Sequence, residues 1–234
     1  MPPKLCYFRD SSILSCAAQV TGTVPAAAAG ALMVRFDRTV FYPQGGGQPS
    51  DQGEVRSGNF IAKVAKVTHA ENDEVDHLVT CDSEISTFLY QGAEVTMAVD
   101  EALRRWHSRL HSAGHVVDAA LARLAITLVP TKGYHYEDGA YVEYEGTIEG
   151  EKSEIAKRIE TACKEIIHED HQVFIDFSDD SDDRKCQRSM RIGNIVSIPC
   201  GGTHVSTLKE IGNMTIRKVD IKKGKTRVCY AVEK

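Results

Sequence analysis

The chain lacks an excess of positive charge and any long apolar run. It has 28 Lys and Arg residues and 33 Asp and Glu residues, which gives a formal net charge of −5. This charge balance argues against an extended nucleic-acid-binding surface but is compatible with a local basic patch. The most apolar window, at 24–34, is short and rich in alanine and glycine, so we expect no membrane span. The amino-terminal MPPKLCYFRD has no apolar signal core.

Cysteine pairing and repeats are also missing. The seven cysteines are odd in number and scattered, and no two form a CxxC pair. A disulfide framework is therefore not expected, and a reducing, cytoplasmic environment is the natural setting. There is no internal repeat and no low-complexity tail. The length of 234 residues fits one large or two small domains.

Alternating apolar residues predict strands in the first part of the chain, at 34–42, 59–69 and 93–100, around a turn-rich segment at 43–53. Asp100 is a good N-cap for a helix over 101–124, and a second helix is predicted over 151–170. Further strands are predicted at 141–144, 173–177, 194–199, 213–221 and 227–232. An acidic run at 176–183 is typical of a solvated loop. The pattern predicts an α+β protein with a β-rich domain at 1–99 and a second domain at 100–234.

Two histidine-containing pairs could bind a metal. His111 and His115 lie four residues apart in the predicted helix, so they share one face. Downstream, Cys200 and His204 flank two glycines and a threonine, and the glycines permit a tight turn that brings both side chains to one point. These nitrogen and sulfur ligands suit zinc, and together they predict one zinc ion per chain. His107, one turn before His111, is an alternative ligand or a supporting group.

Other enzyme classes fit these pairs poorly. A zinc protease of this type needs HExxH, and no carboxylate lies between His111 and His115. Four protein ligands would close a tetrahedral site, whereas a catalytic zinc keeps one position open. Our hypothesis is three firm ligands plus a water molecule, with His204 the most replaceable.

A glycine motif forms the second feature. Gly45, Gly46 and Gly47 precede Gln48, and their uncovered backbone N–H groups can approach an anion or a ribose closely. The alternative is a plain hairpin turn. A phosphate-binding P-loop is excluded because no Lys followed by Ser or Thr comes after the glycines.

Together these motifs make the chain resemble the AlaX-type alanyl-tRNA editing proteins, free-standing relatives of the editing domain of alanyl-tRNA synthetase. The matching segments occur in the family's order: DRTVFYPQGGGQPSDQG at 37–53, HSAGH at 111–115, TKGYHY at 131–136, and IPCGGTHV followed by EIG within 198–212. The HxxxH and CxxxH pairs are shared with the editing domain of threonyl-tRNA synthetase. The GGGQ stretch is specific to the alanyl branch.

The resemblance implies a small β-barrel-like N-terminal domain followed by an α/β editing domain that holds zinc. It implies hydrolysis of the ester that joins serine, or glycine, to tRNA(Ala). By position, His111, His115, Cys200 and His204 would be the zinc ligands, whereas Gly45, Gly46, Gly47 and Gln48 would line the cleft between the domains, and Thr131 would read the serine hydroxyl. The chain leaves no room for an adenylating domain, so we expect it to remove wrong amino acids and not to attach them.

Two other functions are compatible with the sequence. One is a zinc-stabilised module that binds RNA without catalysis, and the other is a zinc hydrolase acting on a small amino-acid ester or amide. If RNA is the partner, phosphate contacts are expected from Arg104, Arg105 and Arg109 beside the metal helix, or from Lys222, Lys223, Lys225 and Arg227 near the end of the chain. The sequence does not predict the oligomeric state.

Overall fold

The structure is a computed structural model that describes residues 2–26, 30–81, 85–179 and 186–234. The chain divides into two compact units. Unit 1 comprises Met1–Gly45 and Pro49–Arg104, and unit 2 comprises Gly46–Gln48 and Arg105–Lys234. The short segment of the glycine motif that ends at Gln48 thus belongs to the same unit as the C-terminal half of the chain.

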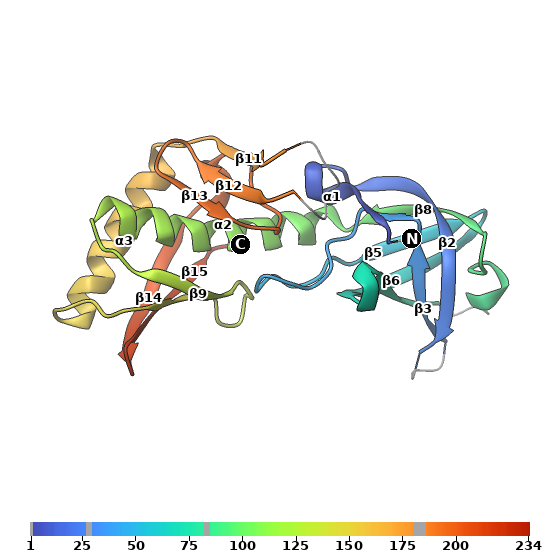
Figure 1. The fold of residues 1–234 in the computed structure, drawn as a ribbon, viewed down its shortest axis with the longest axis horizontal. Helices are drawn as coiled ribbons and strands as arrows, with labels where there is room; N and C mark the ends of the chain where they lie inside the picture. The colour runs from blue at the N-terminus through green and yellow to red at the C-terminus, as the bar shows by residue number, and fades with distance from the viewer. Residues whose placement is uncertain (1, 27–29, 82–84, 180–185) are drawn as a thin grey trace. The chain divides into compact units, whose positions relative to one another are not determined.

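Unit 1 is a closed barrel of six antiparallel strands in the order β2-β3-β7-β6-β5-β8 (Figure 1). The strands are β2 (Ser15–Pro25), β3 (Ala31–Phe36), β5 (Gly53–Ser57), β6 (Phe60–His69), β7 (Val75–Thr80) and β8 (Glu94–Val99). Alternate residues point inward, as Val34 and Phe36 do on β3 and Val95 and Met97 do on β8. Short elements complete the unit: β1 (Lys4–Leu5), α1 (Cys6–Arg9), β4 (Arg38–Thr39), η1 (Glu71–Asp73) and η2 (Ile85–Thr87).

One histidine is fully buried in unit 1. The Nε2 atom of His77 lies 2.8 Å from Thr39 Oγ1, and its Nδ1 atom lies 3.1 Å from the carbonyl oxygen of Val34. Burial lowers the pKa of His77 to about 4, because a charged imidazole is poorly solvated there. His77 is therefore a neutral, hydrogen-bonded core residue at neutral pH.

Unit 2 packs two helices against two sheets. The helices are α2 (Glu101–Arg123), whose first turn lies in unit 1, and α3 (Lys152–His168). The larger sheet has the order β14-β15-β10-β9 and the smaller one β11-β12-β13 (Figure 1). The strands are β9 (Val129–Tyr134), β10 (Tyr141–Glu145), β11 (Val173–Phe177), β12 (Arg188–Ile192), β13 (Val196–Pro199), β14 (Met214–Lys222) and β15 (Lys225–Val232), and η3 covers Leu208–Ile211. The core lies between these layers and includes Leu110, Ile159, Ile166, Met190 and Tyr230.

Helix boundaries follow local chemistry. The Asp100 carboxylate accepts a hydrogen bond from the Leu103 N–H group at the start of α2, as expected for an N-cap. Glu151 does the same for Ser153 and Glu154 at the start of α3. No helix within the described ranges has the length and apolar character needed to cross a lipid bilayer.

Two expectations need correction. The strand predicted over 34–42 is interrupted at Asp37, whose carboxylate accepts a hydrogen bond from the Gln19 N–H group, and the extended pairing ends after β4. The acidic run at 176–183 is not all loop, because Asp176 lies on β11 and pairs with Arg191 at 2.7 Å. Residues 180–185 lie outside the described part of the chain. The predicted mixed α+β class with a barrel in its first part is confirmed.

Candidate metal centre

Helix α2 places the first histidine pair. His111 and His115 are one turn apart on its buried face, and their rings stack with centroids 5.1 Å apart. The three residues between them are small, and Ser112 and Ala113 are themselves fully buried. Small side chains there let another segment come close to the histidine rings.

That segment is the turn between β13 and η3, which carries Cys200 and His204. The ligand atoms of His111, His115, Cys200 and His204 all lie within 4.8 Å of one another. Cys200 Sγ lies 3.4 Å from His111 Nε2, close to the separation of roughly 3.6 Å that two ligands on one tetrahedral zinc would have. The structure thus brings together both pairs, and this group could hold a metal ion.

Hydrogen bonds to Nδ1 orient the three imidazoles. His111 Nδ1 lies 2.7 Å from Gln48 Oε1, and His115 Nδ1 lies 3.1 Å from Asp118 Oδ2. His204 Nδ1 has a weaker contact, 3.4 Å from Ser112 Oγ. Each contact turns Nε2 inward, which is the arrangement that metal-binding histidines need.

The inward nitrogens fit a metal ion. Within the described residues, Nε2 of His115 and Nε2 of His204 are buried and have no hydrogen-bond partner. A buried polar atom without a partner is costly. Coordination to one metal ion would satisfy both nitrogens and the adjacent Cys200 sulfur.

The local electrostatics favour a thiolate at Cys200. Burial alone raises the pKa of this thiol, but the neighbouring His111 and His204 side chains outweigh that effect and bring the pKa well below its usual range. Burial also lowers the pKa of His204 to about 3. A thiolate at Cys200 and a neutral ring at His204 are the forms that bind a metal. Burial alone would lower the pKa of His115, but Asp118 and Cys200 outweigh that effect and raise it to about 10, so this ring must lose a proton when a metal binds.

Glycines make this close packing possible. A Cβ atom on Gly202 would lie 2.2 Å from Cε1 of His111, and one on Gly114 would lie 2.5 Å from Cε1 of His135. Either contact is far below van der Waals distance. Gly114 of HSAGH and Gly202 of CGGTH are therefore required because imidazole rings occupy the space that a side chain would take.

His135 is a neighbour of the site that sequence reasoning did not single out. Its ring stacks on His111 with centroids 4.2 Å apart. Its Nδ1 lies 2.6 Å from the Tyr230 hydroxyl, which itself donates to the Leu110 carbonyl oxygen at 2.9 Å. Because the Tyr230 proton is used there, His135 must donate through Nδ1. Burial lowers the pKa of His135 well below its usual value, which agrees with a neutral ring.

Gln48 is buried and lies beside the metal candidates. Its Oε1 accepts from His111 Nδ1 and, at 3.1 Å, from the N–H group of Thr203, and its Nε2 donates to Thr203 Oγ1 at 2.9 Å. These bonds fix the amide orientation and make His111 the donor at Nδ1. Ser108 extends the network with a hydroxyl contact of 2.7 Å to Thr203.

The other predicted substrate residues lie in different surroundings. Gly47 has a φ of +78°, and a Cβ atom there would lie 2.3 Å from the carbonyl oxygen of Gly133, so this glycine packs against β9. Gly46 is exposed, and the Gly45 carbonyl oxygen accepts from the Tyr42 hydroxyl. Thr131 is exposed, and its hydroxyl donates to the Glu143 carbonyl oxygen at 3.1 Å.

The expected phosphate contacts on α2 need correction. Arg104 is only 3% exposed and forms an ion pair with the fully buried Asp51, so it is not available to RNA. Arg109 donates to the Ile211 carbonyl oxygen at 2.9 Å. Only Arg105 is exposed among these three arginines.

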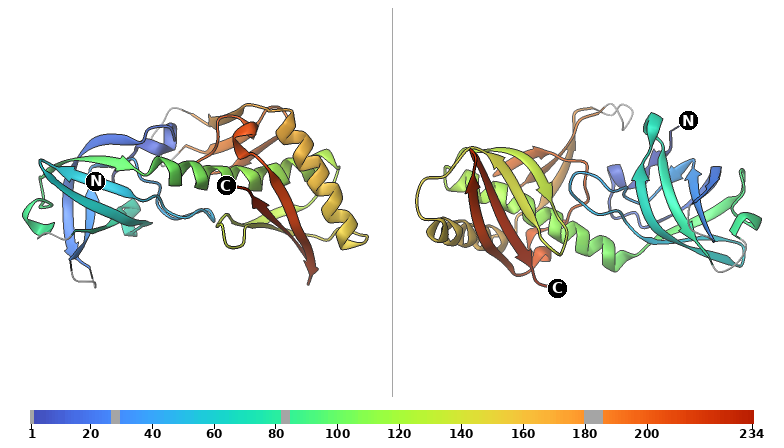
Figure 2. Two further views of the ribbon diagram at one scale, coloured as in Figure 1. Left: turned by 180° about the vertical axis from the view of Figure 1, so that it is seen from behind. Right: turned by 90° about the horizontal axis from the view of Figure 1, so that it is seen from below.

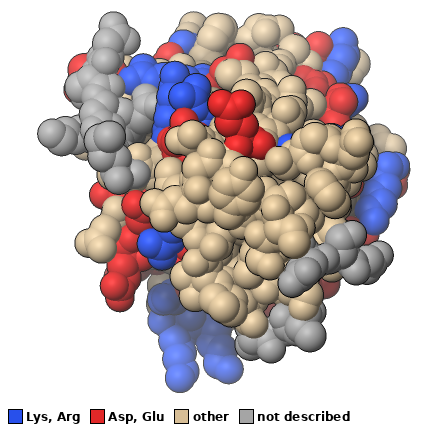
Figure 3. Space-filling model, turned by 90° about the vertical axis from the view of Figure 1, so that its right-hand side faces the viewer, with Lys and Arg blue, Asp and Glu red and all other residues tan. Residues whose placement is uncertain are grey.

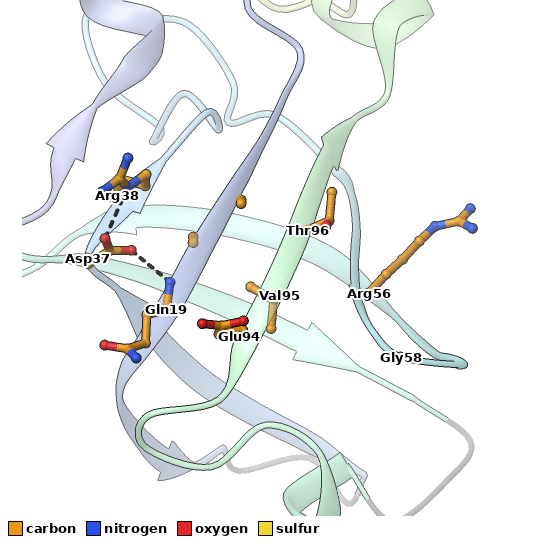
Figure 4. Close-up of a pocket in the computed structure, with 10 residues that line it drawn as sticks. Gln19, Asp37, Arg38, Arg56, Gly58, Glu94, Val95 and Thr96 are labelled. Carbon is orange, nitrogen blue, oxygen red and sulfur yellow. Dashed lines mark hydrogen bonds and ion pairs between the residues drawn. The ribbon is translucent and has the colours of Figure 1, made fainter.

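A cavity of about 510 Å³ in unit 1 contains none of the metal candidates (Figure 4). Strands β2 and β8 form part of its lining. Asp37 at its edge is already engaged by Arg38 and by the Gln19 N–H group (Figure 4). The cavity brings together no group of metal-ligating or nucleophilic side chains, so the candidate centre in unit 2 carries the functional argument.

Comparison with known proteins identifies the family. Residues 9–103 match the family model described as tRNA synthetases class II (A). The alanyl-tRNA editing protein AlaX-M of Pyrococcus horikoshii is 30% identical over 201 residues, which cover 83% of this chain and 84% of that protein. The chain belongs to the AlaX family of alanyl-tRNA editing proteins.

Longer relatives of the AlaX family match over the same extent. AlaX-L of Pyrococcus horikoshii is 30% identical over 193 residues, which cover 76% of this chain but only 46% of AlaX-L. The alanine–tRNA ligase of Pediococcus pentosaceus is 30% identical over 199 residues, which cover 78% of this chain and 22% of the ligase. The chain thus spans less than half of these two relatives. The family inferred from the sequence motifs is confirmed.

Proposed function

We propose that the chain holds one zinc ion through His111, His115, Cys200 and His204. The observation that carries this proposal is the convergence of the four ligand atoms within 4.8 Å, with two buried Nε2 atoms unpartnered in the described chain. Three nitrogens and one thiolate are a donor set that zinc prefers. Gln48, Asp118 and Ser112 hold the imidazoles, and the long Ser112 contact makes His204 the least firmly held ligand.

We propose further that this centre hydrolyses the ester of tRNA(Ala) that carries serine or glycine, in line with the family's name. A bound zinc would supply Lewis-acid polarisation of the ester carbonyl and a water of lowered pKa. An aminoacylation site that selects alanine discriminates weakly against serine and glycine, so a second site that hydrolyses the wrong product is the usual remedy. Gly45 and Gly46, which are not fully buried, are proposed to contact the substrate.

Thr131 is the proposed reader of the serine hydroxyl. Its own proton is committed to the Glu143 carbonyl oxygen, so the free lone pairs can only accept. A serine hydroxyl can donate to them, whereas alanine has no group that can. One such hydrogen bond is worth about 1–3 kcal/mol, or roughly 5- to 150-fold in rate.

A non-catalytic, zinc-stabilised RNA-binding module is the second candidate function. It is favoured by the fact that four protein groups converge on one point, because a fully ligated zinc is usually structural. The two functions differ in turnover. A structural zinc predicts loss of fold without metal and no deacylation in the loaded protein.

The decisive assay compares deacylation of Ser-, Gly- and Ala-tRNA(Ala) with that of a noncognate Ser-tRNA, alongside metal analysis. We expect about one zinc per chain and preferential turnover of Ser- or Gly-tRNA(Ala). Cys200→Ser should lose metal and activity, whereas Cys81→Ser, in the unit 1 barrel, should lose neither. Metal-loaded protein that leaves every ester intact would establish the structural alternative.

Selectivity is tested separately with Thr131→Val. The ratio of rates for Ser- and Ala-tRNA(Ala), measured at subsaturating substrate, should shrink by about 5- to 150-fold. Thr215→Val, at an exposed threonine on β14, is the matched control and should leave the ratio unchanged. An unchanged ratio in Thr131→Val would remove Thr131 from this role.

A further inference from the structure

One face of the four-stranded sheet in unit 2 is not covered by helices. On the inner face, Val142, Tyr144, Val228 and Tyr230 are buried in the core with α2 and α3. The alternate residues point the other way. The view from below shows this outer face in front of the two helices (Figure 2, right). It carries tyrosines and charged side chains, and none of them belongs to the candidate metal centre.

Three tyrosines form a continuous stack on this face. The rings of Tyr136 and Tyr134 have centroids 4.5 Å apart and planes within 20° of parallel, and those of Tyr134 and Tyr141 are 5.4 Å apart and within 15°. The Arg227 guanidinium carbon lies 4.2 Å from the Tyr141 ring centroid. The tyrosine stack therefore runs from Tyr136 to Arg227.

The stack has one open end. Tyr134 is fixed by its hydroxyl, which donates to Asp138 at 3.2 Å, and Tyr141 lies between Tyr134 and Arg227. Tyr136 has no other ring or cation against it within the described residues, and it is partly exposed. An unpaired nucleobase can continue such a stack, because every base has a π-face that stacks on an aromatic ring.

Basic side chains continue from Arg227 along the same part of the sheet. Arg227 also lines a cavity of about 660 Å³ together with four lysines and two carboxylates: Lys152, Lys222, Lys223, Lys225, Glu143 and Asp220. Asp220 is paired with Lys218 at 2.7 Å. Glu143 neutralises Lys225 and Arg227, at 2.9 and 2.7 Å. Lys152, Lys222 and Lys223 are exposed and have no ion pair in the described chain.

The tip of the hairpin between β14 and β15 carries an exposed lysine at a position that disfavours it. Lys223 and Gly224 connect β14 to β15 with φ angles of +52° and +75°, and positions of this kind usually hold Asn, Asp or Gly. Figure 3 shows one face of the molecule, on which uncharged side chains fill the centre, basic and acidic side chains are intermixed around it, and basic side chains lie at the lower edge.

We propose that this face binds single-stranded RNA, with a base on the open end of the tyrosine stack at Tyr136 and phosphates at the basic cluster of Lys152, Lys222 and Lys223. Stacking rings beside a basic groove are the combination that recognises unpaired nucleic acid. An acidic peptide would use the lysines and leave the ring stack without a role.

The inference deepens the proposed function and rests on it in taking the unpaired 3′ end of a tRNA as the ligand. The end of β9 and the residues that follow it connect the two sites. Tyr134 and Tyr136 flank His135 in sequence, and His135 stacks on the metal candidate His111. An RNA end that is stacked at Tyr136 is therefore held one residue away from a side chain that borders the candidate centre.

The test is equilibrium binding of a fluorescein-labelled, uncharged single-stranded RNA octamer to the full chain by anisotropy at low salt. Tyr136→Leu should weaken binding about 5- to 150-fold, the range for the loss of one stacked base. Tyr90→Leu, at a 59% exposed tyrosine of unit 1, is the matched control and should bind as the parent does. Equal affinity of Tyr136→Leu and the parent would overturn the stacking role.

The phosphate contacts have an independent measurement. A double variant, Lys222→Gln with Lys223→Gln, should reduce the slope of log affinity against log salt by about 1.4, or about 0.7 per lost contact. Lys63→Gln with Lys66→Gln, at exposed lysines of the barrel, should leave the slope unchanged. An unchanged slope in the first pair would refute the basic site, even if Tyr136→Leu did not fold.

These measurements are separable from the proposed hydrolysis. Uncharged RNA has no ester, so binding of the octamer requires no turnover. Deacylation without octamer binding would defeat only this inference. Octamer binding without deacylation would defeat only the proposed hydrolysis.

Discussion

The two adjacent glycines of CGGTH should respond very differently to the same substitution. A Cβ atom on Gly202 would lie 2.2 Å from His111 Cε1, 2.3 Å from His111 Nδ1 and 2.9 Å from Gln48 Oε1, whereas a Cβ atom on Gly201 would meet nothing within 4 Å. Ordinary contact begins near 3.4 Å, so Gly202→Ala must displace the His111 ring by roughly 1 Å. The ring cannot simply move aside, because it stacks on His135 and is held by Gln48.

A displacement of that size exceeds the tolerance of a metal site, in which ligand distances vary by about 0.2 Å. Gly202→Ala should therefore lower zinc affinity at least 10-fold and destabilise the protein by about 1–3 kcal/mol. Gly201→Ala should match the parent in both respects. Competition with a chromophoric chelator measures the first quantity, and urea unfolding measures the second. Equal zinc affinity in the two variants would refute the account of why this turn needs glycine.

Three further outcomes are expected. Gln48→Met removes the acceptor that fixes a candidate ligand and should weaken zinc binding about 10- to 100-fold in the same competition, whereas Gln44→Met, at an exposed position of the same motif, should not. The pKa of His77 is about 4 in the folded protein against an ordinary 6.5, so the neutral ring favours the folded state fully above pH 6.5. The free energy of unfolding should fall by about 3 kcal/mol as the pH drops from 6.5 towards 4. Urea denaturation at several pH values should show this decrease, and a His77→Gln variant should reduce it. Arg104→Met leaves Asp51 buried without its partner and should cost about 3–5 kcal/mol in urea unfolding; a loss below 1 kcal/mol would contradict the role of the pair.

The elements predicted best were those in which a regular pattern of apolar residues continues over many residues. The helix predicted over 101–124 is α2, and that over 151–170 is α3, because each presents a regular apolar face to the core. The strands that were missed include β2, β5, β7, β9 and β12. Much of β2 consists of small residues, and β9 contains both Pro130 and Gly133, which an edge strand tolerates.

The candidate site was predictable only in part, for a physical reason. His111 with His115, and Cys200 with His204, carry a local spacing that limits where their side chains can point. The groups that orient them carry no such signal. The pairing of Gln48 with His111 spans 63 residues, and Asp118 looks like any polar residue on a helix until the side chains are placed.

The position of Gln48 has a consequence for how the centre can be assembled. Its amide contacts Thr203 across 155 residues of chain, so the group of side chains around the candidate ligands joins an early segment to a late one. During synthesis, the His111 and His115 pair emerges well before Cys200 and His204, and contacts of such long range form late. A fragment cut at residue 100 would contain every candidate ligand yet lack Gly46–Gln48, and would leave the Nδ1 of His111 without its acceptor. The smallest unit that contains the candidate ligands together with Gln48 is therefore discontinuous in sequence.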